Sequence, residues 1–585
     1  MVTASHSGSW KTRRSGFLNK VHARLATRAE PATGFTSQPE PRTIGSFARG
    51  RQLCAGNILL AGYLVEAPDT MVWDLPMPSE VFEEELHGFT WLDDLAAVGD
   101  APARARAQGW TQEWIARHGR GRGVGWSPDL TGRRLIRWIN HALFLLSGQE
   151  SDASREFFRS LGQQTIFLSR RWKSAAPGLP RFEALTGLIY AGLALEGMDK
   201  HVGPAIKALA RECAEQVDDQ GGIPTRNPEE LLDVFTLLTW AAQALATAGR
   251  SPSQAHMEAI ERIAPTLRAL RHADGGLARF HGGGRGMEGR LDHALAASGV
   301  RARTNTGLSM GYGRLSAGRT SVIVDASGPP MAEVSYNAHA STLAFELTSG
   351  RRPLIVNCGS GASFGPEWRR AGRATQSHST LAIEGYSSAR LGPKRLIAGH
   401  ARELLVDTPS EVGMQKVDDE SGHALTVWHN GYGRTHGLVH ARDLTLSPDG
   451  RSLGGEDTLG AFNRAQREMF DRRFEGSRNE GIAYALRFHL HPDVDAALDM
   501  GGTAVSLALK SGEIWVFRHD GHAELLLEPS VYLETGRLKP RASQQIVLAA
   551  RATKHASQIN WTLAKAQDTP QGIRDLAMDD PLSLE

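Results

Sequence analysis

The sequence predicts an α+β protein with two main domains, a helical domain followed by an antiparallel β-sandwich. Helical periodicity runs over residues 46–300, whereas short alternating strands separated by turns run over residues 305–565. Helices first and strands second indicate two separate domains rather than one interleaved α/β sheet. The chain has 585 residues, of which 41% are hydrophobic, so each domain can form its own core.

Residues 1–45 precede the helical domain, and we predict a disordered basic leader there. The polar run 30–42, with three prolines, separates this leader from the fold. An alternative remains open, because Phe17, Val21 and Leu25 recur at four-residue spacing among the lysines and arginines of residues 10–28. Such a pattern is also typical of a basic amphipathic helix that makes peripheral contact with an anionic membrane.

The helical domain consists of periodic segments joined by short connections that carry Gly, Pro, Asp or Ser. Successive antiparallel helices of this length form an array of α-hairpins. The segments span residues 129–148, 154–172, 181–197, 202–216, 229–247 and 252–270.

The strand domain shows a two-residue alternation. Apolar and polar residues alternate over 320–324 and 343–347, and the segment 349–352 turns the chain into the next strand, 353–356. Residues 447–450 read Ser-Pro-Asp-Gly, a strong turn signal. Short strands with frequent turns indicate a β-sandwich, and we predict a polar tail over 566–585.

Composition excludes several classes of protein. The formal net charge of +2 gives no global field for nucleic acid. Three widely spaced cysteines argue against a disulfide framework or a cysteine-based zinc site. The chain has no apolar run of about 18 residues and no secretory signal pattern. We therefore expect no transmembrane segment and a cytoplasmic protein by default, with a periplasmic or envelope-associated location left open.

The strand domain holds candidate metal ligands. His339 opens one strand, Asn357 ends the next, and His378 follows. Two histidines and an oxygen ligand can hold one zinc ion in tetrahedral geometry, with water as the fourth partner. On spacing alone, the alternative is that both histidines make ordinary hydrogen bonds.

A wider series of motifs resembles the C-terminal domain of the heparinase II/III-like polysaccharide lyase family. It comprises residues 336–343 (Tyr-Asn-Ala-His-Ala-Ser-Thr-Leu), 343–359, 366–369, 373–380, 429–432, 440–442 and 487–492. The resemblance implies an N-terminal incomplete (α/α) toroid followed by a C-terminal antiparallel β-sandwich. It also implies β-elimination of a uronic-acid-containing acidic polysaccharide in the cleft between the two domains.

Such an elimination removes the proton at C5 of a uronate, beside a carboxylate. A cationic group, a strong donor or a metal must neutralise that carboxylate. A base then takes the proton, and an acid protonates the leaving oxygen.

The sequence departs from the family at the residues that supply these groups. The Asn-His pair that opens a toroid helix in active members corresponds to Pro180-Arg181, and Glu230 stands where those members have the tyrosine base. In the strand motif His-x-His-Ala-Asp, the first histidine is Asn337 and the aspartate is Ser341. The metal-binding aspartate of the next strand is Asn357.

The resemblance therefore yields candidates rather than a complete site. Arg181 could neutralise the substrate carboxylate with its two-pronged guanidinium. The candidate bases are Tyr336, Glu230 and His378. The candidate substrate-binding residues are Arg226, Asn337, Trp138, which could stack on a sugar ring, and Arg373, which together with 369–370 forms a basic patch.

Three functions remain open. The leading hypothesis is a polysaccharide lyase with an altered site. The main rival is a catalytically altered glycan-binding or envelope-polysaccharide assembly protein on the same fold. A third is a glycoside hydrolase that uses Glu183 and Glu230 as its two carboxylates.

Overall fold

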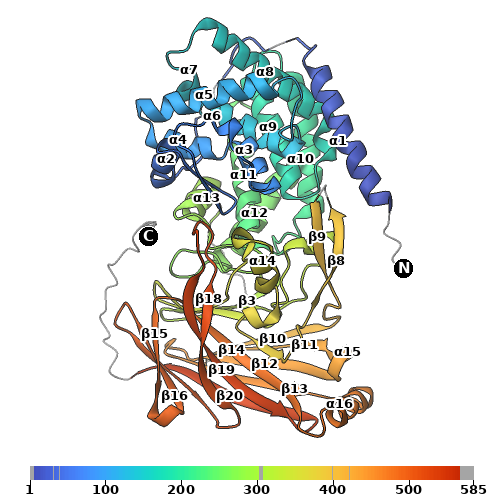
Figure 1. Cartoon of the computed structure of the whole chain (residues 1–585), viewed down its shortest axis with the longest axis vertical. Coiled ribbons are helices and arrows are strands. Elements are labelled where there is room, and N and C mark those ends of the chain that lie inside the picture. Colours follow the sequence, from blue (N-terminus) through green and yellow to red (C-terminus); the bar gives the residue numbers. More distant parts are fainter. Residues whose placement is uncertain are drawn as a thin grey trace.

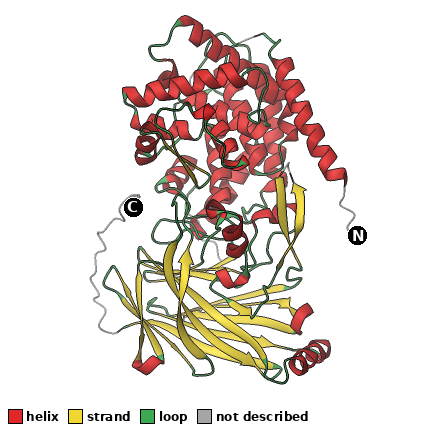
Figure 2. Ribbon diagram, viewed as in Figure 1, coloured by secondary structure: helices red, strands yellow, loops and turns green. Residues whose placement is uncertain are grey.

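The computed structural model describes residues 6–30, 32–37, 40–301, 307–397, 400–419 and 422–566. A helical half is stacked on a strand-rich half, and the helices come first in the chain (Figure 1). Figure 2 shows the same division by element type, with helices gathered at one end of the molecule and strands at the other. The predicted order of an α domain and a β domain is confirmed.

The helical half is built around α9, which is buried without interruption from Phe182 to Ala194 and is contacted by α6, α8, α10 and α11. Its elements are α1 (His6–Ala26), α2 (Phe47–Cys54), β1 (Asn57–Leu60), β2 (Tyr63–Glu66), α3 (Glu80–Gly88), α4 (Trp91–Val98), α5 (Ala101–His118), α6 (Pro128–Asn140), α7 (Ala142–Leu146), α8 (Ser151–Arg171), α9 (Leu179–Ala194), α10 (Val202–Gln216), α11 (Pro228–Thr247), α12 (Gln254–Ala269) and α13 (Arg290–Ser298).

Glycines set the close crossing of α6 and α9. A Cβ atom at Gly132 would lie 2.3 Å from the backbone oxygen of Glu183, and one at Gly187 would lie 2.5 Å from Cα of Gly132. No side chain fits at such distances, so the two backbones touch directly. This contact brings Arg133 of α6 next to Glu183 of α9.

The predicted disordered leader instead contains a helix, α1, that packs against α8. The packed face carries small and polar residues: Ala23 and Ala26 are fully buried, and Nε of Arg171 donates to Asn19 at 2.7 Å. Apolar Phe17 faces outward and is 66% exposed. The prediction was wrong because small alanines, rather than the large apolar residues, make the contact.

The strand half forms a sandwich of two antiparallel sheets. One has the order β10-β11-β12-β13-β20-β17-β16-β15, and the other β18-β19-β14-β6-β5-β4-β3, with β7 beside β14. Its strands are β3 (Tyr312–Ala317), β4 (Thr320–Asp325), β5 (Phe345–Ser349), β6 (Arg352–Val356), β7 (Leu381–Ile383), β8 (Arg390–Ile397), β9 (His400–Val406), β10 (Val412–Asp419), β11 (Gly422–Tyr432), β12 (Leu438–Leu446), β13 (Ser452–Gly460), β14 (Ile482–Leu490), β15 (Val494–Asp499), β16 (Ala504–Leu509), β17 (Ile514–His519), β18 (Glu524–Tyr532), β19 (Arg541–Ala552) and β20 (Ala556–Lys565), and its helices are α14 (Pro366–Gly372), α15 (Gly433–His436) and α16 (Arg464–Gly476).

Aromatic residues from the two sheets meet in the sandwich core. Phe345 of β5 stacks on Trp561 of β20 with ring centroids 5.9 Å apart, and Phe488 of β14 meets the same indole edge-on at 4.8 Å. Both predicted turns are confirmed: β5 and β6 form a hairpin, and Gly450 donates to Ser447 between β12 and β13.

Arg226 joins the two halves. Its guanidinium lies 4.7 Å over the ring of Tyr312 in β3. All five of its N–H groups donate to the strand half, to the carbonyl oxygens of Met310, Gly311, Ser327 and Gly328 and to the carboxylate of Asp325.

The hairpin of β8 and β9 reaches back to the helical half. Its His400 contacts the carboxylates of Glu80 and Glu84 on α3 at 3.2 and 3.0 Å. Among the described helices, none is both long and apolar enough to cross a membrane.

Candidate functional site

The first turn of α11 brings Glu230 to the boundary between the halves. Asn227 caps this helix, since its side-chain oxygen accepts from the backbone N–H groups of Glu229 and Glu230 at 3.0 and 3.2 Å. Pro228 occupies the first helical position, where no N–H is needed. Burial, with the carboxylates of Asp233 and Glu183 adding to it, raises the pKa of Glu230 to about 7.

Tyr336 approaches Glu230 from the strand half. It belongs to a short 3₁₀ segment, η4 (Ala332–Asn337), and is half-buried. Burial, followed by the nearby Glu230 carboxylate, raises the pKa of Tyr336 to about 12. The phenol of the strand half and the carboxyl group of the helical half therefore lie within electrostatic range of each other.

Two arginines flank Tyr336. Nη2 of Arg369 on α14 donates to the backbone oxygen of Tyr336 at 2.8 Å and to Oδ1 of Asn337 at 2.7 Å. The guanidinium of Arg402 on β9 lies 5.5 Å over the Tyr336 ring. We call Glu230, Tyr336, Asn337, Arg369 and Arg402 the interdomain cluster, and all five are half-buried.

A glycine-rich segment, residues 281–284, passes between α11 and η4. A Cβ atom at Gly282, whose φ is +89°, would lie 3.1 Å from Cβ of Asn337, and one at Gly283 would lie 2.3 Å from Oδ1 of Asn227. Glycine is therefore needed where the two halves approach each other.

Arg181 is held inside the helical half. Its Nη1 donates to Glu212 at 2.9 Å and its Nη2 to the backbone oxygen of Ala175 at 3.1 Å. The same Glu212 also accepts from the backbone N–H of Gly178, just before α9. Arg181 therefore fixes the start of this helix.

Glu183, one of the two carboxylates considered for hydrolysis, is bound to Arg133. The guanidinium donates to both carboxylate oxygens, at 2.8 and 2.9 Å. This two-pronged ion pair holds the side chain across the crossing of α6 and α9.

The remaining substrate-binding candidates lie outside the cluster. Arg226 has no N–H left over for a ligand, because all five donate to the strand half. Arg373 is buried and donates to the backbone oxygens of Ala338, Ser335 and Glu403. Trp138 is fully buried, and its indole stacks on Phe157 within the helical core.

The two candidate zinc histidines bond to each other. Nδ1 of His339 lies 3.0 Å from Nε2 of His378, and Nδ1 of His378 lies 2.8 Å from the backbone oxygen of Ala374. A carbonyl oxygen only accepts, so Nδ1 of His378 carries the proton. Burial lowers the pKa of His378 to about 4, which keeps the ring neutral and leaves Nε2 to accept from His339.

This donor set does not fit a zinc ion. The lone pair of His378 points at His339, and the side-chain oxygen of Asn357 accepts from the backbone N–H of Ser379 at 3.0 Å. An amide in place of a carboxylate also removes the negative charge that divalent ions prefer. Within the described ranges, no group of three or more His, Cys, Asp or Glu side chains is arranged to hold a metal.

We expect the purified full-length chain to retain well under one zinc equivalent. Asn357→Asp supplies the anionic ligand that the native amide lacks, so this variant should retain more zinc than the wild type. Elemental analysis after growth in zinc-supplemented medium measures both proteins, with circular dichroism as the check of folding. One tightly held zinc equivalent in the wild type would contradict the conclusion that the histidine pair does not bind zinc.

Sequence reasoning missed two of the contacts that define this region. Arg402 lies far along the chain from Tyr336, on a hairpin whose approach to η4 follows from tertiary packing alone. The pairing of Arg133 with Glu183 depends on the glycine contact of α6 and α9, which no local pattern reveals. The sequence did identify Arg369 as part of a basic patch.

The fold is a helical domain followed by an antiparallel β-sandwich, with the interdomain cluster at the boundary between the two halves. Residues 300–562 match the model of the family described as "Heparinase II/III-like, C-terminal". "FtsZ-localized protein C" of Caulobacter vibrioides is 31% identical over 545 residues, which is 91% of this chain and 91% of that protein. This chain belongs to the heparinase II/III-like family.

Solved structures support the same architecture. A heparinase III structure matches with a TM-score of 0.67 at 13% identity over 96% of this chain and 92% of that chain. The heparan sulfate lyase HepC from Pedobacter heparinus matches with a TM-score of 0.53 at 14% identity over 97% and 92%. At these identities the likeness concerns the fold, and it confirms the predicted toroid followed by a sandwich.

Proposed function

We propose that the protein is a glycan-binding member of its family in which the elimination step has been lost. The observation that carries this proposal is the interdomain cluster, which places two guanidinium groups beside an aromatic ring at the boundary between the halves. Acidic polysaccharide is the expected ligand, and the cluster is its expected site.

Two of the three candidate bases are poorly suited to removing a proton, and the third is opposed by an anionic substrate. Tyr336, with a pKa near 12, is a neutral phenol at pH 7. Nε2 of His378 already accepts a hydrogen bond from His339. Burial raises the pKa of Glu230 to about 7, and an anionic substrate beside it would raise this pKa further.

The same residues are well suited to binding. Arg369 and Arg402 present guanidinium groups beside Tyr336, and a guanidinium pairs with the carboxylates or sulfates of acidic sugars. A half-buried phenol ring offers an apolar face and a polar edge to a sugar ring. Glu230 in its neutral form adds a hydrogen-bond donor without repelling an anion.

The rival function, a polysaccharide lyase with an altered site, has one observation in its favour. A pKa near 7 is the value that suits a general base working at neutral pH, and Glu230 has that value. Glu230→Gln would then abolish any product formation from uronate polymers. A product yield unchanged in that variant would exclude Glu230 as the base.

The pKa of Glu230 leads to a pH-dependent prediction. Its folded pKa lies above the ordinary value of 4.5, so the folded protein binds more protons than the unfolded chain between these values. The wild type should therefore lose about 2–4 kcal/mol relative to Glu230→Gln as the pH rises from below 4.5 to above 7. Chemical unfolding of both proteins across this window measures the difference, and parallel curves would contradict the raised pKa.

The relative's name places that protein at FtsZ, and we extend this location to the present chain as part of the proposal. A glycan-binding protein at FtsZ fits the envelope-polysaccharide assembly role raised by the sequence. Co-sedimentation of the purified chain with FtsZ polymers tests the link, and an unchanged supernatant fraction would count against it.

The outer face of α1 carries the exposed apolar and basic side chains that the predicted peripheral membrane contact requires. Phe17 and Leu25 are exposed there, 66% and 41%, beside Arg14, Lys20 and Arg24. We expect full-length protein to co-sediment with anionic vesicles and Phe17→Ala/Leu25→Ala to do so several-fold less, since buried apolar area drives such binding. Equal sedimentation of both proteins, or binding to neutral vesicles alone, would contradict the prediction.

A further inference from the structure

A groove of about 1340 Å³ lies on the strand half, separate from the interdomain cluster. Helix α14 stands between the two. Arg369 of this helix bonds to Tyr336 in the cluster, whereas the next residue, Arg370, lines the groove. The walls come from α14, the segment after β7, the end of β9, the β11–α15 junction and the first turn of α16.

Four arginines and the two carboxylates of Glu367 and Asp407 line the groove, so its lining is cationic on balance. The side chains of Arg370, Arg390 and Arg434 are 61%, 73% and 73% exposed. Arg390 and Arg434 share the carboxylate of Asp407, which holds the two guanidinium groups side by side. Each guanidinium has five donors, so a shared carboxylate leaves most of them facing the solvent.

The rest of the lining mixes polar and apolar groups and contains an exposed aromatic ring. Tyr386 is 40% exposed, and its ring meets that of His436 at 90° with centroids 4.6 Å apart, an edge-to-face contact that fixes its orientation. Hydroxyl and amide side chains fill much of the remaining wall. Leu391 and Met469 are the large aliphatic side chains among the residues that line it.

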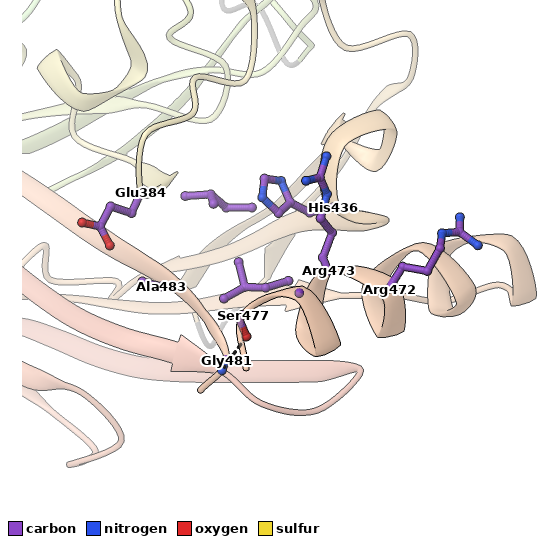
Figure 3. A pocket seen from close by; sticks show the side chains of 10 residues that line it. Glu384, His436, Arg472, Arg473, Ser477, Gly481 and Ala483 are labelled. Atoms are coloured by element: carbon purple, nitrogen blue, oxygen red, sulfur yellow. Dashed lines mark hydrogen bonds between the residues drawn. The ribbon is translucent and has the colours of Figure 1, made fainter. Parts of the chain in front are cut away.

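A second, smaller cavity of about 390 Å³ lies on the other side of His436. Figure 3 shows the guanidinium of Arg473 beside the His436 ring, with Arg472 on the same helix, α16, and Glu384 across the cavity. Nε of Arg473 donates to the backbone oxygen of Thr435, which belongs to the groove wall. Two further arginines therefore lie near the groove, in a cavity that they share with the carboxylate of Glu384.

We propose that this groove binds an acidic oligosaccharide, at a site separate from the interdomain cluster. Guanidinium groups pair with carboxylates or sulfates, hydroxyl and amide groups pair with sugar hydroxyls, and the Tyr386 ring provides a stacking surface. The volume exceeds that of pockets for single small molecules, which hold roughly 300–1,000 Å³, so it suits a chain of several sugar rings. We choose a glycan over an acidic peptide because hydroxyl and amide side chains and an exposed aromatic ring line the groove beside the arginines.

Isothermal titration of the full-length protein tests the proposal with a uronate hexasaccharide as the probe. We expect two binding events for the wild type. Arg390→Ala/Arg434→Ala should weaken one of them by roughly a hundredfold, since each lost charged hydrogen bond is worth about a factor of ten or more. Arg464→Ala, which removes an arginine 93% exposed on α16 and outside the groove, is the matched control and should leave both events unchanged.

The outcomes separate this proposal from the function proposed for the cluster. Loss of one event in the groove variant and of the other in Arg402→Ala supports both sites. A single event that only the groove variant removes supports the groove and counts against the cluster. A single event that only Arg402→Ala removes overturns the groove, as does a failure of the hexasaccharide to bind. Tighter binding of hexaglutamate than of the hexasaccharide, lost in the groove variant, overturns the choice of a glycan.

Discussion

Asp325→Ala should lower the free energy of unfolding by about 3–5 kcal/mol, the range expected when a buried ion pair loses one partner. The Asp325 carboxylate is fully buried and lies 2.6 Å from Nη2 of Arg226, while the hydroxyl of Ser341 donates to it at 2.7 Å. Removing it leaves the Arg226 guanidinium buried without its counter-ion at the boundary between the halves. Scanning calorimetry should show a lower melting temperature, reported for each transition because a chain of this size need not unfold in one step.

Asp407→Ala is the matched control for this prediction. It also removes a carboxylate that pairs with arginines, but Arg390 and Arg434 are largely exposed, and exposed ion pairs contribute no more than about 1 kcal/mol. A melting temperature for Asp325→Ala as high as that of Asp407→Ala would show that the buried pair does not hold the halves together.

Arg402→Ala should weaken the binding of a uronate oligosaccharide at the interdomain cluster by about tenfold to a hundredfold. The Arg402 guanidinium lies over the Tyr336 ring, where a bound acidic sugar would meet both groups. Because a charged, partly desolvated donor is lost, the effect should fall on affinity and leave the fold intact. Titration with the oligosaccharide at low and at moderate salt measures the change, which should shrink as salt rises.

Two further variants show whether charge or geometry matters. Lys394→Ala removes an exposed cation from the same β8–β9 hairpin and should have little effect. Arg402→Lys keeps the charge but loses the planar fork, so its affinity should lie between those of the wild type and Arg402→Ala. Equal losses of affinity in Lys394→Ala and Arg402→Ala would show that general surface charge, rather than the Arg402 guanidinium itself, causes the effect.

The fold was largely predictable from the sequence because its signals are local. Two-residue alternation, turn residues and helical periodicity gave the order of domains, and motif resemblance gave the toroid and the sandwich. The leader was the exception. Its contact with α8 is made by Ala23 and Ala26, residues too small to stand out in a pattern of hydrophobicity.

The site was predicted less well, because its geometry depends on long-range contacts. Tyr336 and Asn337 do lie together at the boundary of the two halves, within electrostatic range of Glu230. Arg181 and Arg226 were predicted to bind substrate. Instead, Arg181 forms an ion pair with Glu212 and Arg226 forms one with Asp325. Neither carboxylate partner could be identified from sequence spacing. The bond between His339 and His378 likewise requires knowing how two loop segments, distant in the sequence, are placed; the prediction that His339 opens a strand was wrong, since β5 begins only at Phe345.

The most direct test of the proposed function is to measure binding and elimination on the same samples. Full-length protein is incubated with heparan sulfate, alginate, pectate and cell-surface glycans, bound ligand is quantified, and the ultraviolet absorbance of unsaturated uronate products is followed. We expect binding of at least one acidic glycan, weakened by Arg402→Ala, with no rise in absorbance over the enzyme-free control. A sustained rise in absorbance that Glu230→Gln abolishes would contradict this account and establish the protein as a lyase.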